Sequence, residues 1–332
     1  MQSKRVVFRA QDKVGIEPFE IGAPGPGEVL VRTEVTLISP GTEGANLMGL
    51  PNTPQQFPKG AGYSNVGRVL EVGEGVEGVR PGDRVTSHGA HASHVIVGAG
   101  RCAGVPEGLS PEAATFSSLT AVSMQGVRKA RVELGESVLV LGQGIVGNLA
   151  LQIARLQGGY PVVGADLDQR RLEVARQVGA DHTVRVGVED VVEATRDLTD
   201  GDGARVVIEA TGAAEPVVAA FQAAGWCGRV VLLASSRGET ERVNFYRDVH
   251  RRGLTVLGAH NSVRPRVDVS SGFWPLADDV KLGLALMAAG RIRVHPLITT
   301  RVPCDQAAEA FHLVTEQRRE ALGILINWKE TA

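Results

Sequence analysis

Three histidines follow one another at intervals of three residues in the segment VTSHGAHASHVIV: His88, His91 and His94. The chain has only eight histidines, so this short segment holds a large share of its imidazoles. Imidazole is the commonest metal ligand among side chains, and it exchanges protons near neutral pH. The segment therefore leaves three alternatives open: a zinc site, an acid–base site, or histidines that only pack on a strand.

The expected local structure argues against a shared metal. The apolar residues around the histidines predict a strand, and residues three apart on a strand point to opposite faces. No acidic or thiol side chain adjoins them in the sequence. We therefore expect no metal triad. Acid–base chemistry and strand packing remain as the alternatives for each histidine.

The composition is that of a globular protein with room for two domains. The 332 residues are 43% hydrophobic and 22% charged, with a net charge of -2. No strongly basic segment suggests nucleic acid or an anionic membrane as a partner. No apolar run is long enough to span a bilayer, and the first residues, MQSKRVVFRAQDKVG, lack the apolar region of a signal peptide, so we expect a cytoplasmic location. The scattered cysteines predict free thiols in a reducing compartment: Cys102, Cys227 and Cys304.

The pattern along the chain changes once near residue 118. Before it, short valine-rich runs alternate with Gly and Pro turns, which predicts a compact, barrel-like β domain over 1–118. After it, apolar runs such as SVLVLG and GRVVLLAS alternate with helical patterns, which predicts βαβ units on a parallel sheet over 119–259. We expect residues 260–332 to fold back onto the first domain.

A glycine motif opens the second domain. Gly142, Gly144 and Gly147 form a GxGxxG spacing directly after the apolar strand VLVL and before a helical pattern. In this setting the first glycine makes a tight turn, the second lets a pyrophosphate approach the backbone, and the third permits close helix–strand packing. The helix N-terminus attracts the phosphates. The sequence therefore predicts a dinucleotide site.

The next apolar strand, YPVVGAD, ends in Asp166, 19 residues beyond Gly147. A carboxylate there accepts hydrogen bonds from the adenosine ribose and repels a 2′-phosphate, which favours NAD over NADP. An alternative role for Asp166 is to cap the following helix, but Asp168 serves that purpose as well. Arg170 and Arg171 argue the other way, because a guanidinium pairs well with a phosphate.

As a whole, the chain resembles the medium-chain dehydrogenase/reductase superfamily, which implies an α/β protein with a GroES-like β-barrel catalytic domain and a Rossmann domain with a doubly wound parallel sheet. Two further segments, 38–43 (ISPGTE) and 62–67 (GYSNVG), resemble a subgroup related to bacteriochlorophyllide a dehydrogenase. The residues that carry the wider resemblance are 26–29, 72–76, 82–85, 142–147, 171–172, 179–181 and 295–299.

The resemblance also shows where this chain departs from zinc-dependent relatives. They have a cysteine where this chain has Ser39, and a Gly-His-Glu where it has Gly62, Tyr63 and Ser64. Hydroxyl groups are poor substitutes for the thiolate and imidazole ligands of zinc. The four-cysteine lobe of those relatives is missing as well. We therefore expect neither a catalytic nor a structural zinc ion.

Without zinc, another group must polarise a carbonyl or take a hydroxyl proton. The resemblance places Tyr63 where a metal ligand stands in relatives, with packing under the cofactor as the alternative. It makes His91 and His88 pocket candidates on a neighbouring strand and puts His94 where a packing aromatic usually sits. Glu43 is expected to orient a partner, bind a substrate hydroxyl, cap a helix start or lie on the surface, and Ser39 is expected to line the site. Either Tyr63 or His91 is expected to be the proton donor, and His91 is the more natural choice near neutral pH. The resemblance implies these cofactor-binding residues: Thr120, Gly142, Gln143, Gly144, Ile145, Val146, Gly147, Asp166, Arg171 and Ser235.

The leading hypothesis is a zinc-independent, NAD(H)-dependent oxidoreductase that interconverts a secondary alcohol and a ketone of small-molecule size. A reductase of activated C=C bonds, of the enoyl or quinone type, is the first alternative, although such enzymes generally use NADPH. A non-catalytic dinucleotide-binding sensor is the second. We expect a homodimer or tetramer.

Overall fold

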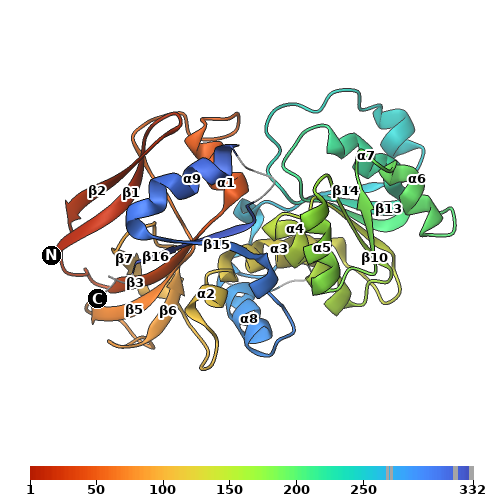
Figure 1. Ribbon diagram of the computed structural model, residues 1–332. Coiled ribbons are helices and arrows are strands. Elements are labelled where there is room, and N and C mark those ends of the chain that lie inside the picture. The colour runs from red at the N-terminus through yellow and green to blue at the C-terminus, as the bar shows by residue number, and fades with distance from the viewer. Residues whose placement is uncertain (267–268, 270–271, 317–320, 329–332) are drawn as a thin grey trace. The chain divides into compact units, whose positions relative to one another are not determined.

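The computed structural model describes residues 1–266, 269, 272–316 and 321–328. The chain forms two compact units, shown in Figure 1. Unit 1 comprises the described residues of Met1–Ser118, Val280–Gly290 and Leu297–Ala332. Unit 2 comprises the described residues of Leu119–Asp279 and Arg291–Pro296. The α/β fold combines a β-rich first unit with a parallel-sheet second unit.

Unit 2 is built on a six-stranded sheet in the order β11-β10-β9-β12-β13-β14. All neighbouring strands in this sheet are parallel. The order is that of a doubly wound dinucleotide-binding fold, with the reversal of direction between β9 and β12. The strands are β9 (Val138–Leu141), β10 (Val162–Asp166), β11 (His182–Arg185), β12 (Ala204–Glu209), β13 (Ala224–Leu232) and β14 (Thr255–Gly258).

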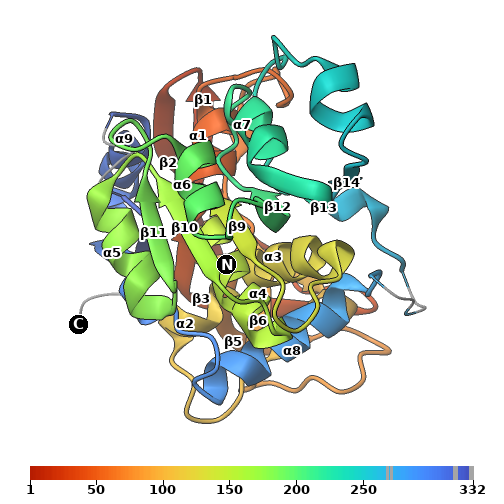
Figure 2. The same cartoon turned by 90° about the vertical axis from the view of Figure 1, so that its right-hand side faces the viewer.

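Helices cover both faces of this sheet, as the turned view shows (Figure 2). On one face α4 packs beside α5, and on the other α6 packs beside α7. The α6–α7 face buries Leu139, Val207 and Phe221 in one apolar cluster. Both faces are thus shielded from water, which explains why the strand sequences are continuously apolar. The helices are α3 (Ser117–Ala130), α4 (Ile145–Gln157), α5 (Gln169–Val178), α6 (Val191–Asp197) and α7 (Pro216–Ala223).

Unit 1 contains a small sheet, β2-β1-β4, and a larger one, β15-β16-β3-β5-β6-β8, in which β7 also pairs with β3. Its strands are β1 (Gln2–Ala10), β2 (Lys13–Glu20), β3 (Glu28–Ile38), β4 (Lys59–Gly60), β5 (Asn65–Val72), β6 (Arg84–Ser87), β7 (His94–Gly98), β8 (Ala103–Gly104), β15 (Ile298–Pro303) and β16 (Gly323–Asn327). Its remaining helices are α1 (Pro40–Leu47), α2 (Pro111–Ala114) and α9 (Ala307–Glu316), while α8 (Leu276–Ala288) includes residues of both units.

Strand β3 differs from the sequence-based expectation. Its alternating pattern predicts a half-buried strand, yet nearly every residue from Val29 to Ile38 is buried. The reason is its central place, since β3 pairs with β5, β7 and β16. A helix starts after Ser110, whose hydroxyl accepts a hydrogen bond from the Ala113 amide at 3.1 Å.

The C-terminal return begins later than the sequence suggests. We assigned residues 260–332 to the first domain, but the described residues of 260–279 and 291–296 group with unit 2. Arg264 explains part of this, because it pairs with buried Asp279 at 2.7 Å. Asp279 also pairs with Arg128 of α3 at 3.0 Å. These ion pairs tie the segment to unit 2.

In the parts of the chain that the structure describes, no helix combines the length and apolar character needed to cross a bilayer.

Candidate active site and dinucleotide site

Glu43 and His91 form a buried pair in unit 1, although 48 residues separate them. The Nε2 atom of His91 lies 2.8 Å from Oε2 of Glu43, and both side chains are almost completely shielded from water. A carboxylate only accepts hydrogen bonds, so the Nε2–H of His91 is the donor in this pair. His91 Nδ1 has no hydrogen-bond partner among the described residues.

This pair corrects two sequence-based statements about the histidine segment. We found no acidic partner beside the histidines, because Glu43 is distant in sequence. We also predicted a strand through all three, yet β6 ends at Ser87 and β7 begins only at His94. The connection is irregular because the His91 amide donates to Ala61 O and the Val6 amide donates to His91 O, both at 2.8 Å.

Glu43 of this pair also stabilises the start of α1. Glu43 lies in the first turn of that helix, and its Oε1 accepts a hydrogen bond from the Ser39 amide at 2.8 Å. Glu43 therefore has two of the four roles that the sequence left open, because one carboxylate oxygen caps the helix start while the other orients His91. Ser39 is itself buried, in the N-cap position.

Tyr63 lies beside this pair and is only partly buried. The preceding residue, Gly62, has φ of +94°, and a Cβ there would lie 2.4 Å from the His91 amide nitrogen. Only glycine fits this close approach, so the segment carrying Tyr63 is packed directly against His91.

Burial raises the pKa of Tyr63 to about 12, and the charge of Glu43 contributes to this rise. Hydrogen bonds with Ser39 and Thr42 act in the opposite direction. At neutral pH the phenol therefore keeps its proton and is available as a hydrogen-bond donor. The structure thus brings the four predicted catalytic side chains together within unit 1: Ser39, Glu43, Tyr63 and His91.

The two other histidines of the segment do not join this group. Burial lowers the pKa of His88, and the charge of Arg101 lowers it further. His94 opens β7, and its Nδ1 lies 3.3 Å from the Ser93 hydroxyl. Among the residues that the structure describes, no three His, Cys, Asp or Glu side chains are arranged to hold a metal ion.

The glycine loop (residues 142–147) of unit 2 joins β9 to α4. Gly142 adopts φ of +86°, and a Cβ at Gly147 would lie only 1.8 Å from the Gly142 carbonyl oxygen. A Cβ at Gly144, by contrast, would meet no atom within 4 Å. The loop therefore has a strained turn, an open position at the helix N-cap and a tight strand–helix contact, which are the three features a bound pyrophosphate requires.

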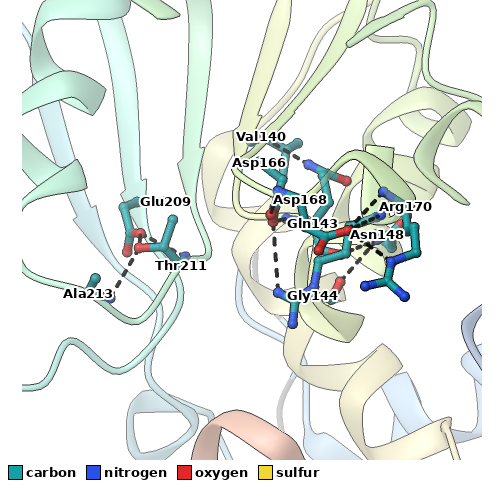
Figure 3. Close-up of polar contacts among 11 residues, drawn as sticks. Val140, Gln143, Gly144, Asn148, Asp166, Asp168, Arg170, Glu209, Thr211 and Ala213 are labelled. Carbon is teal, nitrogen blue, oxygen red and sulfur yellow. Dashed lines mark hydrogen bonds and ion pairs between the residues drawn. The ribbon is translucent and has the colours of Figure 1, made fainter. Parts of the chain in front are cut away.

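Asp166 ends the neighbouring strand β10 and faces this loop (Figure 3). Its Oδ2 accepts from the Gln143 amide at 2.7 Å, and its Oδ1 accepts from the Asp168 amide at 2.9 Å. Asp168 caps α5 by accepting from the Arg170 and Arg171 amides. Asp166 is therefore not the helix cap. The Arg171 guanidinium approaches Asp166 Oδ2 to 3.9 Å.

Asn148 is a functional candidate that we missed in the sequence. It is completely buried in the first turn of α4, and its Nδ2 donates to Gln143 O at 2.6 Å and to Gly144 O at 3.2 Å. It thereby fixes the carbonyl groups of the glycine loop. The Gln143 side chain is buried and donates to Val140 O at 2.9 Å, so only its backbone faces the site. The sequence did contain a signal for Asn148, namely a polar residue on the otherwise apolar face of the predicted helix.

Two further predicted cofactor residues have different surroundings. Ser235 lines a cavity of about 270 Å³ at the ends of β13 and β14, which we call the β13–β14 cavity. Thr120 is completely buried in α3, and its hydroxyl has no hydrogen-bond partner among the described residues. The cavity is lined by residues 232–235, 258–260 and 263.

Comparison with known families agrees with this architecture. Residues 25–147 match the family described as "Alcohol dehydrogenase GroES-like domain", and residues 146–271 match the family described as "Zinc-binding dehydrogenase". Together the two matches span residues 25–271 and support the medium-chain dehydrogenase/reductase superfamily. The predicted fold class is thus confirmed, with a GroES-like domain followed by a Rossmann domain, and the protein is an oxidoreductase of the alcohol dehydrogenase type.

Individual relatives align over nearly the full length of this dehydrogenase. L-threonine 3-dehydrogenase of Pyrococcus furiosus is 28% identical, covering 95% of this chain and 96% of that protein. Human sorbitol dehydrogenase is 27% identical, covering 98% and 95%. A putative zinc-binding dehydrogenase of Sinorhizobium meliloti 1021, solved with NADP, is 26% identical with a TM-score of 0.84, covering 98% and 99%. These comparisons support a nicotinamide cofactor and a small-molecule substrate.

Proposed function

We propose that this dehydrogenase interconverts a secondary alcohol and a ketone with NAD(H), without zinc, and that Tyr63 is the proton donor. The observation that carries the proposal is the group formed by Tyr63, Glu43 and His91 in unit 1. The names of the relatives point to alcohols such as threonine and sorbitol as the substrate class. The cytoplasmic location and the homodimer or tetramer remain predictions.

Within this group the residues have distinct tasks. The bound nicotinamide would supply or accept the hydride at the substrate carbon. Tyr63 is partly exposed and protonated, so its O–H can donate to the substrate oxygen as negative charge develops there. His91 is fully shielded from water and holds Glu43 in place. We therefore assign the donor role to Tyr63 and a positioning role to His91.

The donor set does not suit a catalytic zinc ion. Zinc needs about three nitrogen, sulfur or carboxylate ligands. At the positions that resemble the family's ligands, this chain offers the hydroxyl groups of Ser39 and Tyr63. The nearby carboxylate of Glu43 is already shared between His91 and the Ser39 amide. We therefore propose a reaction without metal, although one of the matching families is described as zinc-binding.

One experiment tests function and metal together. The purified protein is analysed for zinc and then incubated with NAD⁺ and a panel of secondary alcohols and polyols, with and without a chelator, while nicotinamide absorbance is followed. We expect turnover of at least one alcohol, well under one zinc per chain, and no effect of the chelator. Stoichiometric zinc that is needed for activity would contradict the metal-free mechanism. Reduction of only enones or quinones, or cofactor binding without any turnover, would contradict the alcohol assignment.

Cofactor preference is predicted to depend on Asp166. Replacing Asp166 with serine removes the charge that repels a 2′-phosphate, and like charges in contact cost several kcal/mol. We expect Asp166→Ser to shift the ratio of NADH to NADPH dissociation constants by roughly ten- to hundredfold towards NADPH. Cofactor fluorescence titration measures both constants.

Asp168→Ser is the matched control for this change. Serine keeps the helix cap of α5, so neither helix stability nor cofactor preference should change much. If the unaltered protein binds NADPH more tightly than NADH, then Arg170 or Arg171 determines the preference and the assignment of NAD is wrong.

A further inference from the structure

Glu209 is a buried carboxyl that the mechanism above does not use. It ends β12, with Leu141 of β9 and Leu232 of β13 beside it in register. Its side chain is completely shielded from water. In the sequence we treated ARVVIEATG as a fully apolar run, so this residue escaped attention. The signal was the same as for Asp166, a carboxylate at the end of an apolar strand.

The side chain of Glu209 holds the turn that follows β12. Its Oε1 accepts hydrogen bonds from both the amide, at 2.7 Å, and the hydroxyl of Thr211. The Thr211 hydroxyl in turn accepts from the Ala213 amide at 3.1 Å (Figure 3). We call residues 210–213 the Thr211 turn. The other carboxyl oxygen of Glu209 has no hydrogen-bond partner among the described residues.

The main chain of Glu209 holds a second segment. Its carbonyl oxygen accepts from the Leu233 amide at 3.0 Å and from the Ala234 amide at 3.1 Å. Both of these residues line the β13–β14 cavity. A single residue therefore fixes the Thr211 turn with its side chain and a wall of the cavity with its backbone.

The Thr211 turn is also packed against the glycine loop. A Cβ at Gly142 would lie 2.9 Å from both Cα and the amide nitrogen of Thr211. Gly212, within the turn, lies near Ser235 at the other end, since a Cβ at Gly212 would be 3.5 Å from Ser235 O. The turn thus connects the predicted pyrophosphate site with the β13–β14 cavity.

The order of the strands indicates which half of a bound dinucleotide would lie next to Glu209 and the β13–β14 cavity. Asp166, the predicted ribose ligand of the adenosine half, stands on β10, on one side of β9. A dinucleotide crosses the sheet edge where the strand order reverses, between β9 and β12. Its nicotinamide half must then extend towards β12, β13 and β14, where Glu209 and the cavity lie.

We propose that Glu209 is a positioning residue for the nicotinamide half of the cofactor, acting through the Thr211 turn and residues 233–234. The inference rests on the proposed dinucleotide site of unit 2. Burial raises the pKa of Glu209, and its hydrogen bonds with Thr211 act in the opposite direction. An amide of the same shape keeps the oxygen that accepts from the Thr211 amide and hydroxyl, whereas an apolar side chain cannot hold the turn.

The test compares whole and partial cofactors on three variants. Glu209→Leu removes the acceptor, Thr211→Val removes the hydroxyl, and Glu209→Gln keeps the acceptor. Dissociation constants are measured for NADH and for ADP-ribose, which lacks the nicotinamide ring. We expect Glu209→Leu and Thr211→Val to weaken NADH binding by roughly ten- to hundredfold, because hydrogen bonds that order the turn are lost. ADP-ribose binding should change less than about threefold, and Glu209→Gln should bind both like the unaltered protein.

The outcomes separate this inference from the proposed function. If Glu209→Leu does not fold, Thr211→Val alone decides, since Thr211 is exposed and valine keeps the shape of its side chain. Equal weakening of NADH and ADP-ribose would assign Glu209 a merely structural role, and unchanged NADH binding in Thr211→Val would also overturn the inference. Asp166→Ser serves as the control, because it should weaken both ligands alike. If the unaltered protein binds neither ligand, the proposed function fails and this inference with it.

Discussion

Tyr63→Phe is expected to lower turnover of an alcohol or ketone substrate by roughly 10²–10⁴-fold, the usual contribution of a general acid or base. The change removes one oxygen atom and leaves the ring that packs beside Glu43 and His91. Because the glycine loop and Asp166 belong to the other unit, the dissociation constant for NADH should stay the same. Steady-state kinetics and cofactor fluorescence measure the two quantities on one preparation.

The pH dependence of the two directions should differ, because the pKa of Tyr63 is raised to about 12. Ketone reduction needs the protonated phenol, which is present at all pH values well below 12, so its rate should stay flat there. Alcohol oxidation needs the phenolate, whose fraction rises tenfold for each pH unit below 12. Oxidation should therefore become faster as the pH increases, and this dependence should disappear in Tyr63→Phe.

Tyr160→Phe is the matched control for this experiment, because Tyr160 is exposed and in unit 2. Glu43→Gln and His91→Asn complete the series and should lower turnover less than Tyr63→Phe if these residues only position the phenol. Should Tyr63→Phe keep turnover within a few-fold of the unaltered protein while His91→Asn loses it, His91 is the donor. If both variants keep it, the mechanism proposed here is wrong.

Gly147→Ala is expected to weaken NADH binding by up to about a hundredfold and to destabilise the protein. The added methyl would lie 1.8 Å from the Gly142 carbonyl oxygen, so α4 and the glycine loop must move apart. Forcing an extra methyl group into a packed contact costs roughly 1–3 kcal/mol. The movement also displaces the amide groups that would bind the pyrophosphate. Fluorescence titration and thermal unfolding report the two effects separately.

Gly144→Ala provides the sharper comparison within the same loop. A methyl group there meets no protein atom within 4 Å, so the main cost to stability is the poorer N-cap preference of alanine, roughly 0.5–1 kcal/mol. The melting temperature should therefore fall only slightly, while the dissociation constant for NADH rises because the methyl occupies the approach of the pyrophosphate. If Gly144→Ala binds NADH normally, the phosphates do not pass over this glycine.

The strands and loop of unit 2 could be predicted because their determinants are local. The run from Val138 to Leu141 is apolar on both faces, and the glycine spacing follows it directly. The same holds for Asp168 as the cap of α5, since a cap bonds to amides two and three residues away. The strand, the glycine loop and the helix cap depend on residues that are close together in the chain, so they can be recognised from the sequence alone.

The contacts that define the candidate active site are not local. Glu43 and His91 meet only because α1 and the connection before β7 converge in the folded unit. The connection loses its strand geometry through backbone bonds to Ala61 and Val6, and neither residue is close to it in sequence. Glu209 and Asn148 were overlooked for a related reason. What sets them apart from other polar residues at a strand end or on a helix is that their side chains are buried, and burial is known only from the folded structure.

Asp168 caps α5, whereas Asp166 is the residue proposed to set cofactor preference, and this separation of roles affects how the enzyme can evolve. Asp168 alone caps α5, so a mutation at position 166 leaves the start of that helix intact. With Asp166 in its proposed role, a change of one codon alters the preferred nicotinamide cofactor and leaves the Asp168 cap of α5 in place. Selection can then act on cofactor preference at position 166 independently of the stability of the fold.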